Sequence, residues 1–312
     1  LKPFPIPFDT TGHALQLALA KMQRVHMISR QVLARHGLVQ QPGLTLRTQA
    51  TMSEAPASEL GKTNFVEVNG HKFFVVSNGQ SGTPVLCMPG AMGTAETDFF
   101  PQMKGLAEKH QVVSFDPRGY GKSRPPVRDW PEDFYHRDAE DAHAIMQALG
   151  FKQYNIVGWS DGANAAVILA SKKPEAVSKM AIFGGNAFVL QEDIDSYEAT
   201  RDVKKNWSKR MLALHTPVYG DDLQPMWDGF CDAMKGIMAR GGDICQGEAK
   251  KIQCPVYVLA GAKDPIVPNF HPEWFAKNIP NAKLHFFPDG KHNIHIKYGD
   301  EFNKLVMDFF AE

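Results

Sequence analysis

The chain has little cysteine and no long apolar run. Its 312 residues include four cysteines, none in a C-x-x-C pair: Cys87, Cys231, Cys245 and Cys254. This usage argues against a zinc module or a disulfide framework, and we expect four unpaired thiols in a reducing compartment. No window approaches the roughly 18 consecutive apolar residues of a membrane-spanning helix. The sequence therefore predicts no membrane span, and without an H-E-x-x-H or comparable spacing it predicts no metal and no cofactor.

An excess of charge of either sign is also lacking. Thirty-four basic residues balance thirty-four acidic ones, so the positive footprint of a general nucleic-acid-binding protein is absent. Hydrophobic residues make up 43% of the chain and charged residues 22%, which is ordinary for a globular protein with a sizeable core. The length fits one large domain with an appendage or two modest domains. No oligomeric state is predicted.

The N-terminal segment, residues 1–62, departs from this balance. Between Leu1 and Ser53, six lysines and arginines face one acid, Asp9, and from Met22 to Ser53 there is no acid at all. Such an arginine-rich amphipathic run is typical of a mitochondrial transit peptide. The alternative is an ordinary exposed basic helix or tail on a cytoplasmic protein. Residues 53–62 are rich in Pro, Ser and Gly and predict a linker, so we expect the folded domain to span 63–312.

Short β-rich runs alternate with helical patterns over the rest of the chain. Residues 65–68 and 72–76 flank Asn69-Gly70, which favours a hairpin with a type I′ turn. Further strands are predicted at 84–88, 112–115, 154–157, 180–183, 256–260 and 283–287. Helices are predicted at 98–109, 134–149, 160–172 and 300–310. This alternation predicts an α/β fold with a mainly parallel sheet flanked by helices. A helical cap, at about 190–251, is inserted after the sixth main strand.

A candidate nucleophile lies in the sequence G-W-S-D-G at residues 158–162. It follows an apolar strand and precedes a helix rich in Ala and Leu, which is the context of a nucleophile elbow. Gly158 and Gly162 permit the tight turn around Ser160, and the N-terminus of the helix directs backbone N–H groups toward a developing oxyanion. We therefore predict Ser160 as the nucleophile.

A serine nucleophile needs a histidine base and an acid that orients it, in the order Ser, Asp or Glu, His on this fold. Asp264 follows the strand at 256–260, and His292 follows the last strand. Both lie at carboxyl ends of strands, where open α/β sheets hold their active sites. Other acids are less well placed, namely Asp193, Asp195, Asp221 and Asp222 in the cap and Asp289 beside the histidine loop. His295 is expected to serve packing or to lie on the surface.

Two loops complete the predicted site. The sequence P-G-A-M-G at 89–93 can turn backbone N–H groups inward, so the oxyanion hole is predicted to use the N–H of Met92 or Ala91 together with that of Asp161. The run D-P-R-G-Y-G-K-S at 116–123 is expected to be structural, with Asp116 and Arg118 holding neighbouring loops.

The chain from about 63 to 312 resembles the α/β-hydrolases, and within them the valacyclovir hydrolase (biphenyl hydrolase-like) family. The resemblance lies in G-A-M-G with E-T-D-F at 90–99, the run 116–126, G-W-S-D-G, K-D-P at 263–265, and G-K-H-N with D-E-F-N-K-L at 290–305. It implies hydrolysis of α-amino acid esters, with Asp161 binding the substrate's ammonium group and a mitochondrial location. The chain differs at Ala91 and Ala163, where the family has Met and Gly.

The position of Asp161 also has a physical interpretation. An unpaired carboxylate beside Ser160 opposes negative charge on the acyl oxygen, whereas a bound cation would neutralise it and orient the ester. The sequence thus predicts a serine esterase whose small-molecule substrate carries a free amino group. The alternatives are a carbon–carbon bond hydrolase of ring-cleavage products, a non-catalytic hydrolase-fold binding protein, and an Asp161 that merely favours the helix N-terminus.

Overall fold

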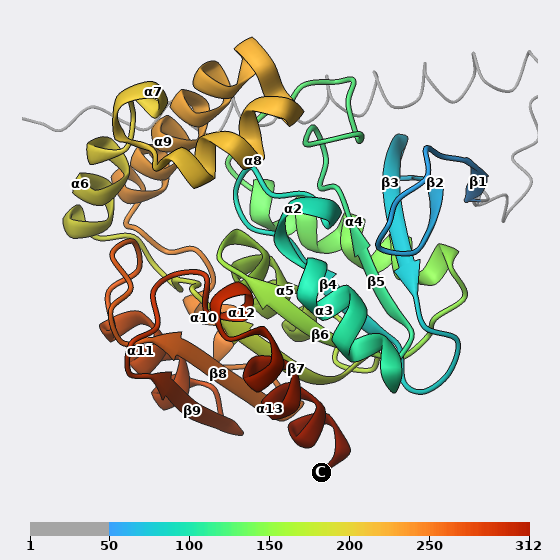
Figure 1. Cartoon of the computed structure of the whole chain (residues 1–312). Coiled ribbons are helices and arrows are strands. Elements are labelled where there is room, and N and C mark those ends of the chain that lie inside the picture. The colour runs from blue at the N-terminus through green and yellow to red at the C-terminus, as the bar shows by residue number, and fades with distance from the viewer. Residues whose placement is uncertain (1–49) are drawn as a thin grey trace, which may run out of the picture. The chain divides into compact units, whose positions relative to one another are not determined.

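The computed structural model describes residues 50–312, which contain one nine-stranded sheet (Figure 1). The predicted transit peptide lies outside the described residues, apart from its last few positions. The sheet order is β1-β2-β3-β5-β4-β6-β7-β8-β9, antiparallel from β1 through β5 and parallel from there to β9. The strands are β1 (Thr51–Glu54), β2 (Lys62–Val68), β3 (His71–Asn78), β4 (Val85–Met88), β5 (Val112–Phe115), β6 (Tyr154–Trp159), β7 (Val177–Phe183), β8 (Val256–Gly261) and β9 (Ala282–Phe287).

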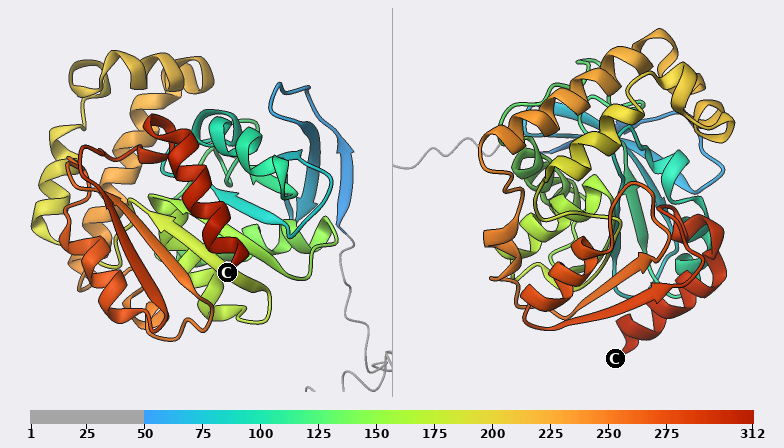
Figure 2. Two further views of the ribbon diagram at one scale, coloured as in Figure 1. Left: turned by 60° about the horizontal axis from the view of Figure 1, so that its bottom comes forward. Right: turned by 90° about the vertical axis from the view of Figure 1, so that its left-hand side faces the viewer.

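The helices cover both faces of this sheet and form the inserted cap (Figures 1 and 2). Those of the main domain are α2 (Ala95–Asp98), α3 (Phe100–Gly105), η1 (Leu106–Glu108), α4 (Phe134–Ala148), α5 (Asp161–Lys172), α11 (Phe270–Asn278), α12 (Ile294–Lys297) and α13 (Gly299–Ala311). Those of the cap are α6 (Gln191–Ala199), α7 (Val203–Asn206), α8 (Lys209–Tyr219), η2 (Gly220–Asp222), α9 (Leu223–Ala239) and α10 (Gln246–Ala249). The α/β-hydrolase fold with an inserted helical region is therefore confirmed.

Alternation along the strands divides the core into two layers. Phe73 and Val75 of β3 belong to the apolar cluster that includes α4, α5 and the cap, whereas Phe74 and Val76 belong to the cluster that includes α3 and α13. Successive side chains of a strand point to opposite faces, so a strand covered on both sides must be apolar at nearly every position. Strands β4 and β5 accordingly have no exposed residue. This double burial fixes the carboxyl ends of the strands, which carry the candidate site.

The hairpin turn has the predicted backbone. Asn69 and Gly70 have φ values of 51° and 68°, the pair of positive values that a type I′ turn requires. The segment before it differs from the expectation, because Thr51–Glu54 pairs antiparallel with β2 where a linker had been predicted to begin at Ser53. Its four side chains are all exposed, so the strand lacks the apolar alternation that predicts strands. With β1 counted, the cap follows the seventh strand, β7, and the ordered chain begins before Thr63.

The single helix predicted at 98–109 is divided in the structure into α3 and η1, and it is preceded by the separate short helix α2. Thr94 caps α2, which ends at Asp98, and α3 begins after Phe99 with Pro101 in its first turn. Proline has no N–H to continue a helical hydrogen-bond ladder, but it is tolerated in a first turn. The chain therefore restarts a helix there, and Asp98 is left at a bend beside the 89–93 loop.

Candidate active site

Strand β6 ends in a sharp turn at Ser160, and α5 begins at the next residue. Ser160 has φ of 54°, and its N–H donates to the carbonyl of Phe183 at 2.9 Å. Both glycines of the motif are required by close approach. A Cβ on Gly162 would lie 2.0 Å from the Met88 carbonyl oxygen, and one on Gly158 would lie 2.8 Å from the Gly162 carbonyl oxygen. The turn is the strained strand-to-helix elbow that the sequence predicted.

Asp264 and His292 meet at the carboxyl ends of β8 and β9. The Nδ1–H of His292 donates to Oδ2 of Asp264 at 2.8 Å, and the two side chains are 13% and 6% exposed. The backbone N–H groups of Ile266 and Val267 donate to Oδ1 of Asp264 at 2.9 and 3.1 Å. With Nδ1 protonated, Nε2 of His292 is left as a proton acceptor.

The pairing controls the charge of both groups. Burial opposes ionisation of Asp264, but attraction to His292 and the hydrogen bonds outweigh it and lower the pKa of the carboxyl. Burial likewise disfavours a cationic His292, but the attraction and the hydrogen bond to Asp264, together with the carboxylates of Asp161 and Asp98, outweigh burial and raise the pKa of the imidazole. The pair is therefore suited to hold a proton on His292 and release it again.

Trp159 brings His292 next to the elbow. Its Nε1–H donates to the His292 carbonyl at 3.1 Å, and the two rings lie 5.4 Å apart. A Cβ on Gly184 would lie 2.9 Å from Cε1 of His292, so this glycine makes room for the ring. Within residues 50–312, no hydrogen bond joins the Ser160 hydroxyl to His292. The structure thus joins Asp264 to His292 and places the imidazole beside the elbow.

The 89–93 loop reaches the elbow from the other side. A Cβ on Gly90 would lie 3.1 Å from Cβ of Ser160. The Gly93 N–H donates to the Gly90 carbonyl at 3.0 Å, and Met92 has φ of 60°. Across the described chain, the N–H groups of Ala91, Met92 and Asp161 find no acceptor. These are the free donors that an oxyanion hole needs, and the turn leaves both Ala91 and Met92 as candidates.

Asp98, for which the sequence predicted no role, holds this loop. Its Oδ2 accepts from the Gly90 N–H at 3.0 Å, and its Oδ1 accepts from the Thr97 hydroxyl at 2.7 Å. Burial raises the pKa of Asp98 to about 7. A Cβ on Gly93 would lie 1.8 Å from the same carboxylate. An acid with no catalytic motif around it gives no local signal, and only the fold shows that it supports the 89–93 loop.

Asp116 and Arg118 have the structural role predicted for them. Asp116 accepts from the N–H groups of Ala95 and Lys122 at 2.9 and 2.7 Å, which ties the start of α2 to the turn after β5. Arg118 binds Asp141 of α4 through two hydrogen bonds of 2.7 and 2.9 Å.

His295 is a packing residue, as expected. It is fully buried, its Nε2–H donates to the Asp98 carbonyl at 2.8 Å, and its ring lies 4.6 Å from that of Trp159. Burial lowers the pKa of His295 to about 3, so the ring stays neutral.

The carboxylate of Asp161 is held by one oxygen. The hydroxyl of Tyr135, from α4, donates to Oδ1 at 2.7 Å and also contacts Sδ of Met234 in the cap at 3.6 Å. In the described part of the chain, Oδ2 receives no hydrogen bond. Burial raises the pKa of Asp161 to about 6, against the opposing effects of Tyr135 and Arg128. Tyr135 lies 26 residues from its partner, so sequence spacing could not have linked them.

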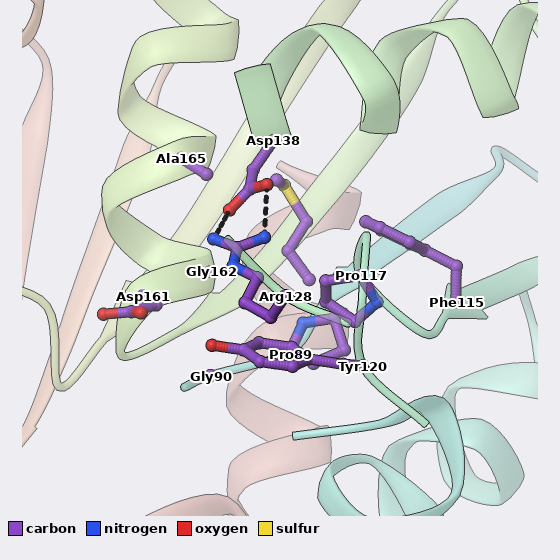
Figure 3. Close-up of a pocket in the computed structure, with 11 residues that line it drawn as sticks. Pro89, Gly90, Phe115, Pro117, Tyr120, Arg128, Asp138, Asp161, Gly162 and Ala165 are labelled. Atoms are coloured by element: carbon purple, nitrogen blue, oxygen red, sulfur yellow. Dashed lines mark hydrogen bonds and ion pairs between the residues drawn. The ribbon is translucent and has the colours of Figure 1, made fainter. Parts of the chain in front are cut away.

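A small pocket adjoins the elbow, with Asp161 and Gly162 in its wall (Figure 3). Arg128 enters this pocket with its guanidinium bound to Asp138 at 2.7 and 2.6 Å. The pocket is lined by Met88, Pro89, Gly90, Phe115, Pro117, Tyr120, Arg128, Asp138, Asp161, Gly162 and Ala165. Neither Arg128 nor Asp138 was singled out from the sequence.

The structure also shows the surroundings of the cysteines and of two acids that were considered as alternatives to Asp264. All four cysteines are buried and free. Asp193 binds the buried His271, and Asp289 binds the exposed Lys263, so each of these rival acids is paired with a residue other than His292. Among residues 50–312, no cluster of three or more His, Cys, Asp or Glu could hold a metal ion. No helix in that range is long and apolar enough to cross a membrane.

Comparison with known proteins gives relatives over most of the chain. A family model described as alpha/beta hydrolase fold matches residues 83–225. The chain is 44% identical over 247 residues to Serine hydrolase BPHL of Homo sapiens, covering 78% of this chain and 84% of that protein. The Mus musculus protein of the same name is 42% identical over 247 residues, with coverage of 78% and 84%.

Solved structures give the same fold. A mutant of CumD, a meta-cleavage product hydrolase from Pseudomonas fluorescens IP01, has a TM-score of 0.66 at 23% identity, covering 80% of this chain and 98% of that one. At this identity the likeness concerns the fold alone, whereas the two mammalian proteins are related closely enough to define a family.

Proposed function

Because the chain belongs to the α/β-hydrolase family, as a serine hydrolase of the BPHL type, we propose that it cleaves α-amino acid esters through Ser160, His292 and Asp264. The observation that carries the substrate class is the carboxylate of Asp161, which lies one residue after the nucleophile with one oxygen left without a hydrogen bond in the described chain. The elbow and the Asp264–His292 pair support the chemistry.

The reaction would proceed in two steps. The Ser160 oxygen attacks the acyl carbon while Nε2 of His292 takes the hydroxyl proton, and the ester oxygen leaves with that proton as an alcohol. Water then attacks the acyl-enzyme with His292 again as the base, which releases the acid and restores Ser160. Asp264 stabilises the imidazolium that forms in each step. The free N–H of Asp161 and that of Ala91 or Met92 would bind the oxyanion.

Asp161 would bind the substrate's ammonium group through Oδ2. A carboxylate at this position would otherwise repel the oxyanion, and an ammonium between them removes that penalty. Tyr135 orients the carboxylate through Oδ1 without neutralising its charge. A cation bound there also favours ionisation of a carboxyl whose pKa burial has raised to about 6, so binding and charge support one another.

The pH dependence follows from two ionisations. His292 must be neutral to accept a proton, so kcat/KM should rise with pH through the raised pKa of the imidazole. The ammonium of an α-amino ester is lost at roughly pH 8, by analogy with α-amino groups. We therefore expect a bell-shaped profile for amino esters, but a rise to a plateau for the matched N-acetylated esters. The same upper limb on both substrates would argue against ammonium recognition.

Replacement of Asp161 is the sharpest test. Asp161→Asn keeps an oxygen for Tyr135 but removes the charge, and it should lower kcat/KM on amino esters by roughly thirtyfold to several thousandfold, the cost of breaking a desolvated charge pair. The N-acetylated ester should lose far less, because the oxyanion donor at this residue is the backbone N–H. Tyr135→Phe is the matched control, because it removes the hydrogen bond and keeps the charge. Equal losses by Asp161→Asn on both esters would leave only a structural role for Asp161.

The two alternative functions, a carbon–carbon bond hydrolase and a non-catalytic binding protein, require different features of the site. A carbon–carbon bond hydrolase acting on dianionic substrates needs a free cation near Ser160, but the arginine in the adjoining pocket, Arg128, is bound to Asp138. Turnover of a ring-cleavage product faster than of amino esters would favour that activity. A non-catalytic binding protein would not react with a fluorophosphonate, whereas the proposed enzyme should be labelled at Ser160.

A mitochondrial location is proposed from the basic run at 22–53 and from the family resemblance. Fusion of this run to a reporter should direct the reporter to mitochondria, and replacing Arg24, Arg30 and Arg35 with Gln should abolish that import. A reporter that stays in the cytoplasm in both forms would remove the proposal.

A further inference from the structure

Arg128 is a buried cation beside the proposed ammonium site. Its side chain is 1% exposed, and its guanidinium lies 4.9 Å from the ring of Tyr120 and 5.4 Å from that of Phe134. A third hydrogen bond, of 3.2 Å, runs from Nη1 to the Arg118 carbonyl. Arginine remains protonated in proteins, so this charge must be balanced nearby.

Two carboxylates can balance it. Asp138 binds both terminal nitrogens, at 2.7 and 2.6 Å, and Asp161 lines the same pocket (Figure 3). The three charges affect one another, because Arg128 lowers the pKa of Asp161 and Asp138 raises it. Asp161 also faces Tyr135, Tyr197 and His292.

The arrangement leaves one negative charge. Arg128 and Asp138 cancel each other as a bidentate pair, and the carboxylate of Asp161 remains without a cationic partner among the described residues. If Asp138 were neutral, the buried guanidinium would have Asp161 as the next carboxylate in the pocket. An ammonium would then meet a neutral cluster.

We propose that Asp138 is a specificity-determining residue, which binds Arg128 and so keeps the Asp161 carboxylate available to the substrate's ammonium group. This rests on the proposed function, and it adds that discrimination between charged and neutral esters depends on a residue that does not touch the substrate. Asp138 acts through Arg128 and is therefore a positioning residue.

The quantity measured is the ratio of two kcat/KM values, that of phenylalanine benzyl ester divided by that of its N-acetylated form. Asp138→Asn should lower this ratio at least about tenfold, mainly through KM of the amino ester, because the freed guanidinium neutralises Asp161. Asp141→Asn is the matched control. Asp141 lies three residues on in the same helix and is also bound by two hydrogen bonds to an arginine, here from Nε and Nη2 of Arg118, outside the pocket. It should lower stability without changing the ratio.

A double variant separates charge from structure. Arg128→Met with Asp138→Leu removes both charges and leaves Asp161 as the single charge of the cluster, so the ratio should return to within about threefold of the wild type. A merely structural role would make the double variant at least as poor as Asp138→Asn. Circular dichroism and thermal unfolding report whether each variant is folded, and the ratio is independent of the active fraction of a preparation.

The outcomes distinguish this inference from the proposed function. A wild-type enzyme without preference for the free amine contradicts the proposed function itself. If the wild type has the preference and Asp161→Asn loses it, but Asp138→Asn keeps it, only the role of Asp138 is overturned. A double variant that fails to recover the ratio overturns that role as well.

Discussion

Helices α5 in the sheet domain and α8 in the cap each follow a serine. Ser208 precedes α8 with an extended backbone, and its hydroxyl accepts a hydrogen bond from the Met211 N–H at 3.2 Å. Ser160 precedes α5 with φ of 54° and ψ of −122°, and its side chain makes no such capping bond. The same residue type at the same helical position therefore serves local stability in the cap and is left free at the elbow.

The difference comes from what holds each turn. In the cap, the serine side chain itself satisfies a backbone donor of the first helical turn, as is usual at helix starts. At the elbow, the turn is held by the sheet, through the Ser160 N–H bond to Phe183 and the close approach of Gly162 to the Met88 carbonyl. A hydroxyl without a capping role, in a turn that its neighbours keep strained, can serve chemistry.

The largest expected effect comes from removing the hydroxyl at the elbow. Ser160→Ala should lower kcat on amino esters by about 10⁴-fold or more, because the nucleophile is lost. Its free energy of unfolding should change by less than about 1 kcal/mol, since no folded-state hydrogen bond is removed. Ester turnover and urea unfolding measured on one preparation check both. Activity within tenfold of the wild type would contradict the nucleophile.

The elbow was predictable because its signals are local. G-x-S-x-G places glycine where a Cβ would collide, and Asp264 and His292 are found by their positions at the ends of two apolar strands. Tyr135, Asp98, Arg128 and Asp138 were missed for the opposite reason. Each acts through a contact between segments that the fold brings together, and the residues around them give no local sign of it.

The second-largest effect is expected from replacing a buried acid, and it can be compared between Asp98 in the sheet domain and Asp193 in the cap. Asp98→Asn leaves one of the two donors, the Gly90 N–H or the Thr97 hydroxyl, without its acceptor, so we expect a loss of about 1–3 kcal/mol of stability. The 89–93 loop should shift as well, and kcat should fall by about tenfold. Asp193 accepts from the Leu190 N–H and from His271 at 2.8 and 2.9 Å. Asp193→Asn likewise leaves one of these two donors without its acceptor, and it should cost stability with a smaller effect on kcat.

The stability lost in Asp98→Asn should depend on pH. Burial raises the pKa of Asp98 from 3.8 to about 7, so between these values the folded state binds more protons than the unfolded state. The stability of the wild type therefore declines as pH rises through this window, by linkage. Asn does not titrate, so the difference between wild type and variant should shrink from pH 4 to pH 8. A difference that grows with pH would contradict a buried, proton-binding Asp98.

The cap was predictable only as a helical interval. Its longest helix, α9, contains Pro225 in the first turn and Gly229 and Gly236 in its interior, residues that weaken helix signals. Gly229 is required because a Cβ there would lie 2.3 Å from the Trp130 ring. Tertiary packing overrides propensity here, whereas the buried strands of the sheet show propensity and burial in agreement.

The smallest effect is expected at the cap serine. Ser208→Ala removes the acceptor for the Met211 N–H, so α8 loses its N-cap, at a typical cost of about 1 kcal/mol. Helix α8 ends at Tyr219, whose hydroxyl donates to the Met92 carbonyl at 2.8 Å and so contacts the 89–93 loop. The capped end lies ten residues away, so the contact should persist, and kcat/KM should stay within about twofold of the wild type. Thermal unfolding and ester turnover of Ser208→Ala and Ser160→Ala, measured side by side, complete the comparison. If Ser208→Ala instead lost activity in proportion to stability, the cap would hold the 89–93 loop more directly than the sheet does, and the division between the two regions would be wrong.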